Sequence, residues 1–315
     1  MGPVVPWRLL LSVLLVFGAV RICFPAAPTT AGAVAPDYSA KGADTCLKCH
    51  DDANVAAIFG TRHAVAADQR TPFGQRQCES CHGPGGDHAK RLHPGEKRTP
   101  MPLFATGSTA SVMQQNQVCL GCHTQQRHLL DWQGSVHQRE DVACVSCHRI
   151  HATHDPVTVV AEQPAVCYQC HKRVRSDFEK FSAHPLHEGD MACSACHAPH
   201  DSLYPALLKR PTLNQTCYSC HAEKRGPFLW EHAPVAEDCS NCHLPHGSVN
   251  PALLTNRPPL LCQQCHAADD HPSVAFTGTG LADRVPSSFL LGGSCTNCHS
   301  HVHGSNAPSG ADLSR

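Results

Sequence analysis

The stretch Cys193-Ser-Ala-Cys-His197-Ala-Pro-His200 contains the pattern from which the rest of the chain is interpreted. Thiols three residues apart lie on one side of a single helical turn, and the next residue continues that turn. Two such thiols can form thioethers with the two vinyl groups of haem, and the histidine after them can bind the iron from one face. Cys-x-x-Cys-His is therefore the attachment signature of a c-type haem.

The same pattern occurs ten times and uses twenty of the 21 cysteines. The cysteines expected to form thioethers are Cys46, Cys49, Cys78, Cys81, Cys119, Cys122, Cys144, Cys147, Cys167, Cys170, Cys193, Cys196, Cys217, Cys220, Cys239, Cys242, Cys262, Cys265, Cys295 and Cys298. The expected proximal iron ligands are His50, His82, His123, His148, His171, His197, His221, His243, His266 and His299. Half of a zinc site, a redox dithiol or a disulfide framework would explain the cysteines. None of these explains a histidine after every pair, so the sequence predicts ten covalent c-type haems.

Fifteen further histidines are available for the second face of each iron. Several recur at fixed places: one follows the motif histidine with two residues between, as in His148-Arg-Ile-His151, and another precedes the same motifs, as in Ser-Ala-His184. The expected distal iron ligands are His63, His88, His137, His151, His184, His200, His232, His246, His271 and His303. His301 competes with His303, and His187 with His184. For each of them the alternative is a surface histidine or a partner of a haem propionate.

The ligand set indicates what the haems do. The chain has only four methionines, one of them Met1, so methionine cannot supply the second ligands. Ligation by two histidines implies low potentials, because methionine ligation raises the haem potential. It also closes both axial positions, whereas a haem that transforms a substrate needs one open. The sequence therefore predicts electron transfer, with no catalytic residues.

The N-terminal residues have the features of a secretion signal. Arg8 precedes an apolar run from Leu9 to Val20, and small residues follow it. The run is shorter than the ~20 residues that a membrane-spanning helix needs. Residues 1–33 are expected to be a signal peptide, 34–43 a linker and 44–315 the decahaem domain; an uncleaved anchor helix is the alternative. Cys23 is then removed with the signal, and the mature protein is exported.

Composition predicts an unusual interior. The 315 residues include only three Trp, four Tyr and ten Phe, too few for conventional cores around ten cofactors. Pro and Gly number 25 and 22, and no useful strand alternation is present. The predicted fold class is a multihaem cytochrome c, mostly irregular with short α-helices, an elongated haem-packed core and little or no β structure. The net charge of −1, without a basic block, argues against nucleic-acid binding.

The motifs are organised in tandem two-haem repeats that begin at Cys119, Cys167 and Cys217, with a partial fourth from Cys262. Their starts are 48, 50 and 45 residues apart. The stretches His200-Asp-Ser-Leu-Tyr-Pro-Ala-Leu-Leu and His246-Gly-Ser-Val-Asn-Pro-Ala-Leu-Leu show the repeat most clearly. Serial repeats that contact mainly their neighbours place their redox centres in a row.

The motif spacing resembles that of the periplasmic decahaem cytochromes of the MtrA, DmsE and PioA type. So do Trp132-Gln-Gly-Ser-Val-His137, Glu188-Gly-Asp-Met-Ala-Cys193, Cys242-His-Leu-Pro-His-Gly-Ser248 and the C-terminal Cys298-His-Ser-His-Val-His-Gly-Ser-Asn-Ala-Pro-Ser-Gly310. The resemblance spans Asp44 to Arg315. The family often has Arg where this chain has His187, which favours His184 as the ligand.

The resemblance implies a chain that lies inside an outer-membrane β-barrel porin, serving extracellular respiration or iron oxidation. It implies periplasmic or inner-membrane redox partners, and an extracellular cytochrome or terminal reductase beyond the barrel. An irregular backbone cannot face lipid, so only a closed barrel would let it cross. A soluble periplasmic electron shuttle and a multihaem reductase, which needs a five-coordinate haem, are the alternatives.

Overall fold

The structure is a computed structural model that describes residues 35–105, 108, 110–200, 203–266 and 295–314. The chain divides into residues 1–36 and 37–315. The expected signal peptide, 1–33, lies outside the described residues, as does His271. Everything that follows concerns residues 37–315.

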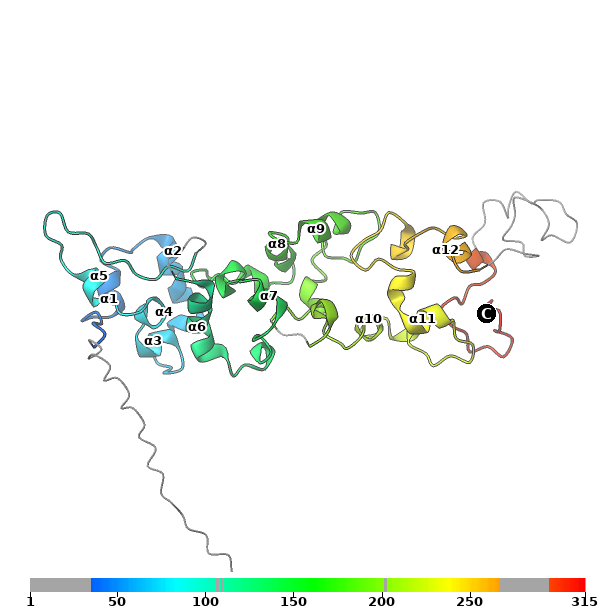
Figure 1. The fold of residues 1–315 in the computed structure, drawn as a ribbon, viewed down its shortest axis with the longest axis horizontal. Coiled ribbons are helices and arrows are strands. Elements are labelled where there is room, and N and C mark those ends of the chain that lie inside the picture. The colour runs from blue at the N-terminus through cyan, green and yellow to red at the C-terminus, as the bar shows by residue number, and fades with distance from the viewer. Residues whose placement is uncertain (1–34, 106–107, 109, 201–202, 267–294, 315) are drawn as a thin grey trace, which may run out of the picture. The chain divides into compact units, whose positions relative to one another are not determined.

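The secondary structure of this unit is a succession of short helices joined by irregular chain (Figure 1). The α-helices are α1 Ala43–Cys46, α2 Ala53–Ala56, α3 Pro72–Gln75, α4 Glu79–His82, α5 Gly86–Ala89, α6 Val112–His123, α7 Val136–Arg139, α8 Gln163–Cys167, α9 Lys172–Phe178, α10 Leu213–Cys217, α11 Ala233–Glu237 and α12 Leu260–Gln263. The 3₁₀ helices are η1 Ala57–Gly60, η2 Arg62–Ala64, η3 Arg127–Leu129, η4 Cys144–Ser146, η5 Pro156–Thr158, η6 Cys193–Ala195, η7 Pro205–Leu207, η8 Ala222–Lys224, η9 Cys239–Asn241, η10 Pro251–Leu253 and η11 Cys295–Asn297. The prediction of a mostly irregular chain with short helices is confirmed.

Each haem-attachment motif forms one helical turn, as its spacing predicts. In nine motifs the N–H of the histidine donates to the carbonyl of the first cysteine at 2.9–3.1 Å, and the tenth lies within α6. Odd-numbered motifs begin inside an α-helix, at Cys46, Cys119, Cys167, Cys217 and Cys262. Four of the five even-numbered motifs instead begin a 3₁₀ helix, and the exception begins at Cys78, directly before α4.

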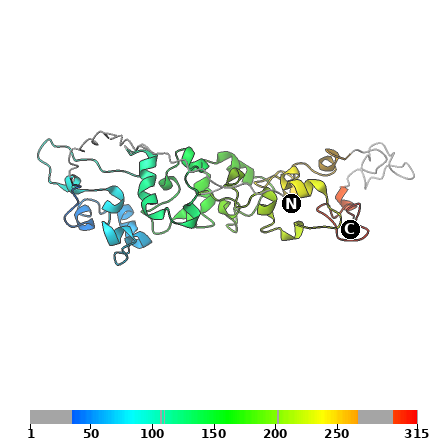
Figure 2. The same ribbon diagram turned by 60° about the horizontal axis from the view of Figure 1, so that its bottom comes forward.

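Extended structure is limited to isolated bridges, and no sheet forms among the described residues (Figures 1 and 2). Ser182 pairs with Ser248 and Trp230 with Ser305, in each case antiparallel. Each of these bridges joins the segment before one repeat's distal histidine to the segment that follows an even motif of the next repeat. The repeats are therefore linked to one another by short backbone contacts across 66 and 75 residues.

The side-chain core is sparse, as the composition predicts. One cluster contains Ala43, Ile58 and Phe73, and a second contains Tyr168, Phe178 and Leu186. Many large apolar side chains are exposed, among them Phe181 at 81% and Leu203 at 79%. Within the described ranges, no helix is both long enough and apolar enough to cross a membrane.

Candidate haem-binding sites

The first thiols of the motifs come together in pairs. Each odd motif places its first cysteine within hydrogen-bonding reach of the first cysteine of the next motif along the chain. The pairs are Cys46 with Cys78, Cys119 with Cys144, Cys167 with Cys193, Cys217 with Cys239 and Cys262 with Cys295. Burial, together with the neighbouring thiol, raises the pKa of Cys46 to about 11 and that of Cys217 to about 12.

The second thiols connect the remaining neighbours. Cys81 lies close to Cys119 and Cys122, and burial together with these two groups raises its pKa to about 11. The same electrostatic proximity joins Cys147 to Cys170, Cys196 to Cys220 and Cys242 to Cys265. Each motif is thus beside the motif before it and the motif after it, alternately through its first and its second cysteine. The order of the ten motifs in space is their order in the sequence.

The structure also pairs the expected proximal and distal histidines. Nine proximal rings each lie opposite one expected distal ring, with centroids 5.7–6.5 Å apart. The pairs are His50 with His88, His82 with His151, His123 with His63, His148 with His200, His171 with His137, His197 with His246, His221 with His184, His243 with His303 and His266 with His232. The tenth expected distal ligand, His271, lies outside the described residues, and His299 is the proximal histidine for which no pair is described.

These separations fit an iron atom held between two imidazoles. Imidazole nitrogens bind metals at about 2.0–2.1 Å, and each ring centroid lies roughly 1.1 Å behind its nitrogen, so two axial rings should have centroids roughly 6.3 Å apart. The narrowest pair, His148 with His200, has its Nε2 atoms 3.4 Å apart. An iron would require these two nitrogens to separate by only about 0.6 Å.

The pairing follows a rule that crosses repeat boundaries. The histidine of each even motif from the second to the eighth faces a histidine just after the next even motif, as His148 faces His200. From the third on, each odd motif's histidine faces one that precedes the even motif before it, as His221 faces His184. Among the nine described pairs, only that of His50 with His88 departs from both patterns. Most sites therefore need residues from two repeats.

Backbone carbonyls hold three of the distal rings in one tautomer. Nδ1 of His137, His184 and His232 donates at 2.9 Å to the carbonyls of Pro199, Pro245 and Val302, respectively. A carbonyl can only accept, so the proton lies on Nδ1 and the lone pair on Nε2. The lone pair is what an iron needs from these histidines.

Proximal rings are held in a similar way. Nδ1 of His197 donates to Ala206 O and Nδ1 of His243 to Ala252 O, both at 2.8 Å. His82 donates to Pro102 O at 3.0 Å and also contacts the edge of Phe104. His148 differs from these three, because its Nδ1 lies 2.6 Å from a carboxylate oxygen of Asp155.

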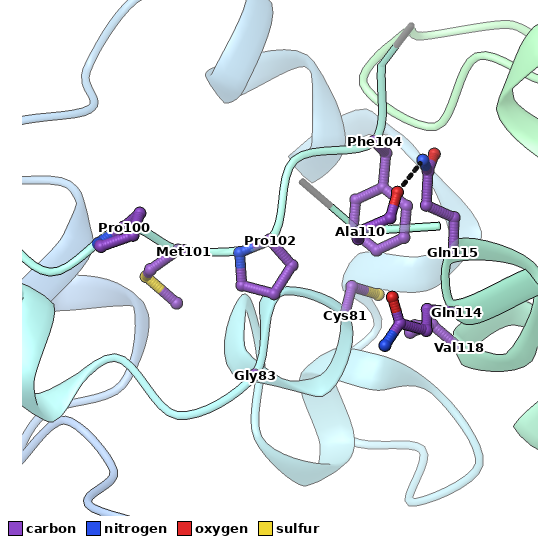
Figure 3. A pocket seen from close by; sticks show the side chains of 10 residues that line it. All are labelled: Cys81, Gly83, Pro100, Met101, Pro102, Phe104, Ala110, Gln114, Gln115 and Val118. Atoms are coloured by element: carbon purple, nitrogen blue, oxygen red, sulfur yellow. Dashed lines mark hydrogen bonds between the residues drawn. The ribbon is translucent and has the colours of Figure 1, made fainter. Parts of the chain in front are cut away.

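A cavity of about 420 Å³ lies beside the second motif (Figure 3). Cys81 opens onto it, and apolar side chains such as Pro102, Phe104 and Val118 form much of its wall. One side is bounded by Gln115, whose Nε2 donates to Ala110 O at 3.0 Å. An apolar space next to the thiol and the ring of one motif suits the hydrophobic face of a macrocycle.

Burial keeps several of the paired histidines uncharged. The pKa of His200 falls to about 4, first because the ring is buried and then because His148, His128 and His137 are near. Burial also lowers the pKa of His63, His82, His246 and His303. Neutral imidazole is the form that binds a metal, so these rings need no proton loss at neutral pH.

The competing histidines lie elsewhere. Nε2 of His187 donates to Phe178 O at 3.1 Å, whereas His184 faces His221. The backbone N–H of His301 donates to Leu313 O, and His303 is the ring opposite His243. Three other histidines have no expected role as ligands. His154 contacts Glu162, and the ring centroid of His128 lies 5.7 Å from that of His200. His93 donates its backbone N–H to Glu96.

Sequence reasoning missed one set of residues that positions the paired motifs. Asn116 Nδ2 donates to Val142 O, and its Oδ1 accepts from Cys144 N at 2.8 Å. Asn214 bonds in the same way to Val235 O and Cys239 N. Each asparagine lies three residues before the first cysteine of an odd motif, and this shared position was the available signal.

Comparison with known proteins gives the following similarities. Residues 184–226 and 232–271 match a family described as the doubled CXXCH motif, and residues 78–164 match the NrfB-like cytochrome c-type proteins. The chain is 50% identical to the multihaem cytochrome MtrA of Shewanella baltica over 282 residues, which are 89% of this chain and 83% of that protein. It is 29% identical to the cytochrome c-type protein NrfB of Haemophilus influenzae over 40% of this chain and 63% of that protein. For NrfB of Escherichia coli the identity is 28%, over 42% and 66%.

Proposed function

The chain belongs to the family of the multihaem cytochrome MtrA, and on that premise we propose that it holds ten c-type haems and passes electrons along them in chain order. Nine opposed imidazole pairs, each spaced for one iron, are the observation that carries the proposal. The tenth site combines His299 with His271. When bound, the haems supply one-electron chemistry between ferric and ferrous iron.

The chain's own residues hold and insulate the cofactors. Two cysteines of each motif anchor one macrocycle, and the paired histidines close both faces of its iron. Carbonyls on Nδ1, such as Pro245 O on His184, fix the ring orientation so that little rearrangement accompanies a change of oxidation state. The alternating thiol contacts bring consecutive attachment motifs together, which supports transfer from each haem to its neighbours.

This proposal is tested by counting haems and inspecting their ligands. Intact-mass analysis of the purified protein should find ten attached groups, and magnetic spectra should contain only low-spin ferric iron. A clearly smaller number would refute the ten-haem relay. A substantial high-spin signal would indicate an open iron and favour a reductase instead.

We further propose that the protein is exported to the periplasm and lies within an outer-membrane β-barrel porin, taking electrons from or giving them to redox partners on either side. The irregular backbone supports this, because unsatisfied backbone groups cannot face lipid, and a closed barrel provides the enclosure. The hydrocarbon layer is about 30 Å thick, too far for one tunnelling step but passable along a row of haems.

Liposomes that enclose a redox dye provide the test. The dye should become reduced by an external donor only when the protein and its barrel are reconstituted together. Liposomes with the barrel alone and with the cytochrome alone are the controls. If the pair conducts no faster than the barrel alone, the protein is a soluble periplasmic shuttle rather than a conduit.

A further inference from the structure

The repeats differ in the group that binds the proximal histidine of the even motif. A proline lies eight residues after each of His148, His197 and His243. In two of these repeats the carbonyl of the residue after that proline, Ala206 or Ala252, accepts from Nδ1 of the motif histidine. In the repeat of His148, Nδ1 instead bonds a carboxylate.

Backbone conformation explains the difference. Ala206 and Leu207 have φ of 53° and 55°, and Ala252 and Leu253 have φ of 54° and 57°. This left-handed pair is rare for residues other than glycine, and it turns the alanine carbonyl toward the ring. Val157, at the corresponding place, has no positive φ, and its carbonyl accepts from Gln163 Nε2 at 2.7 Å. The usual carbonyl is thus not presented to His148.

Asp155 takes over this position with two fixed contacts. Its Oδ2 lies 2.6 Å from Nδ1 of His148, and its Oδ1 accepts from Arg149 N at 3.1 Å. The His148 side chain is 30% exposed and that of Asp155 21%. The carboxylate is therefore held against the ring by the backbone and is partly withdrawn from water. In this respect the site differs from those of His197 and His243.

We propose that Asp155 is a positioning residue that lowers the reduction potential of the haem on His148 below those of the haems on His197 and His243. The inference rests on the proposed function, because it requires a haem on each motif. A charged acceptor binds the Nδ1 proton more strongly than a neutral carbonyl and makes the imidazole a stronger donor to iron. A stronger donor and a nearby negative charge both favour ferric over ferrous iron. The proton stays between His148 and Asp155, and only one electron moves.

The consequence is a low-potential step within the relay. The fourth motif lies between the third and the fifth, because its thiols contact Cys119 and Cys170. When the row is partly reduced, the haem on His148 remains ferric longer than the haems on His197 and His243.

The test uses the full-length holoprotein with Asp155→Asn, which keeps the size of the side chain and removes its charge. Glu162→Gln is the matched control, since Glu162 bonds His154, which is not an expected ligand, at 3.2 Å. Asp155→Glu keeps the charge. The readouts are a spectropotentiometric titration and the near-infrared magnetic circular dichroism band that reports axial ligand strength.

In D155N, the component of the titration that belongs to one haem, one-tenth of the total absorbance change, should shift from the lowest potentials to higher ones. The equilibrium constant for reducing that haem should rise at least tenfold, which is 59 mV for one electron. The band of one strongly donating histidine should disappear with it. E162Q should match the wild type, and D155E should restore most of the low potential. If D155N is poorly produced, the near-infrared band of a strongly donating histidine in the wild type still tests the proposal.

Identical titrations of D155N and E162Q, or a wild type without the strongly donating component, would overturn the inference. The haem count is measured first, so the two proposals fail separately. If the wild type has ten low-spin haems and D155N has no effect, the relay proposal stands and the tuning role of Asp155 is refuted. A Cys144–Cys147 peptide without haem mass would refute both.

Discussion

Replacing Asn214 by alanine should loosen the contact between the seventh and eighth motifs. Asn214 is 7% exposed. Its Nδ2 donates to Val235 O at 3.0 Å and to Ala236 O at 3.3 Å, and its Oδ1 accepts from Cys239 N at 2.7 Å. Alanine removes all three bonds and leaves the N–H of Cys239 without this acceptor.

The expected loss follows from the number of bonds and their burial. A neutral hydrogen bond contributes about 1 kcal/mol net, and an unsatisfied buried donor costs about 1–3 kcal/mol. The free energy of unfolding should therefore fall by about 3 kcal/mol. At roughly 2–4 °C for each kcal/mol in a chain of this size, the melting temperature should fall by roughly 6–12 °C.

Far-UV circular dichroism of the holoprotein measures the melting temperature, and hydrogen exchange of the peptide containing Cys239 locates the change. Asn241→Ala is the control, because Asn241 is exposed and makes one bond, from Nδ2 to Pro234 O. It should cost less than about 1 kcal/mol. If N214A melts within about 2 °C of N241A, the asparagine does not fix the motif pair and the reasoning is wrong.

Three further predictions concern single side chains. Burial alone would raise the pKa of Glu79, but hydrogen bonds from Ser39 and Gly85 hold it below its usual 4.5. The wild type should therefore be more stable than E79Q above pH 4.5 and should lose this advantage as the pH falls through the pKa of the folded state. Melting temperatures measured across this pH range test the prediction. Ala252→Val should cost about 1–2 kcal/mol in chemical unfolding because a branched side chain resists φ of 54°, whereas A252G should stay close to wild type. H184A should produce one high-spin haem in electron paramagnetic resonance, and H187A should not; equal spectra would contradict the pairing with His221.

The local structure was predictable because its cause is local. Motif spacing fixes a single helical turn, and the ten motifs each form one. The few aromatic residues and many prolines indicated a thin side-chain core, and the structure has two small clusters. The first feature follows from residues within a few positions of one another, and the second from the composition of the whole chain.

The partners of the rings could not be predicted in the same way. His148 and His200 are 52 residues apart, and His232 is 70 residues from the carbonyl that holds it. Many histidines recur at similar places, so spacing alone did not assign a distal ring to a motif. Asn116 and Asn214 went unnoticed because a polar residue before a motif has no chemistry of its own until the second motif folds against it.

The dependence of most sites on two repeats has a consequence for biogenesis. A chain exported with its N-terminus first delivers His148 to the maturation machinery about fifty residues before His200. On the proposed function, each newly attached even-numbered haem from the second to the eighth has one face uncovered until the following repeat arrives. The haem sites are therefore completed in order along the chain, each after more of the chain has been exported. A prematurely terminated chain would retain a reactive iron near its C-terminal end.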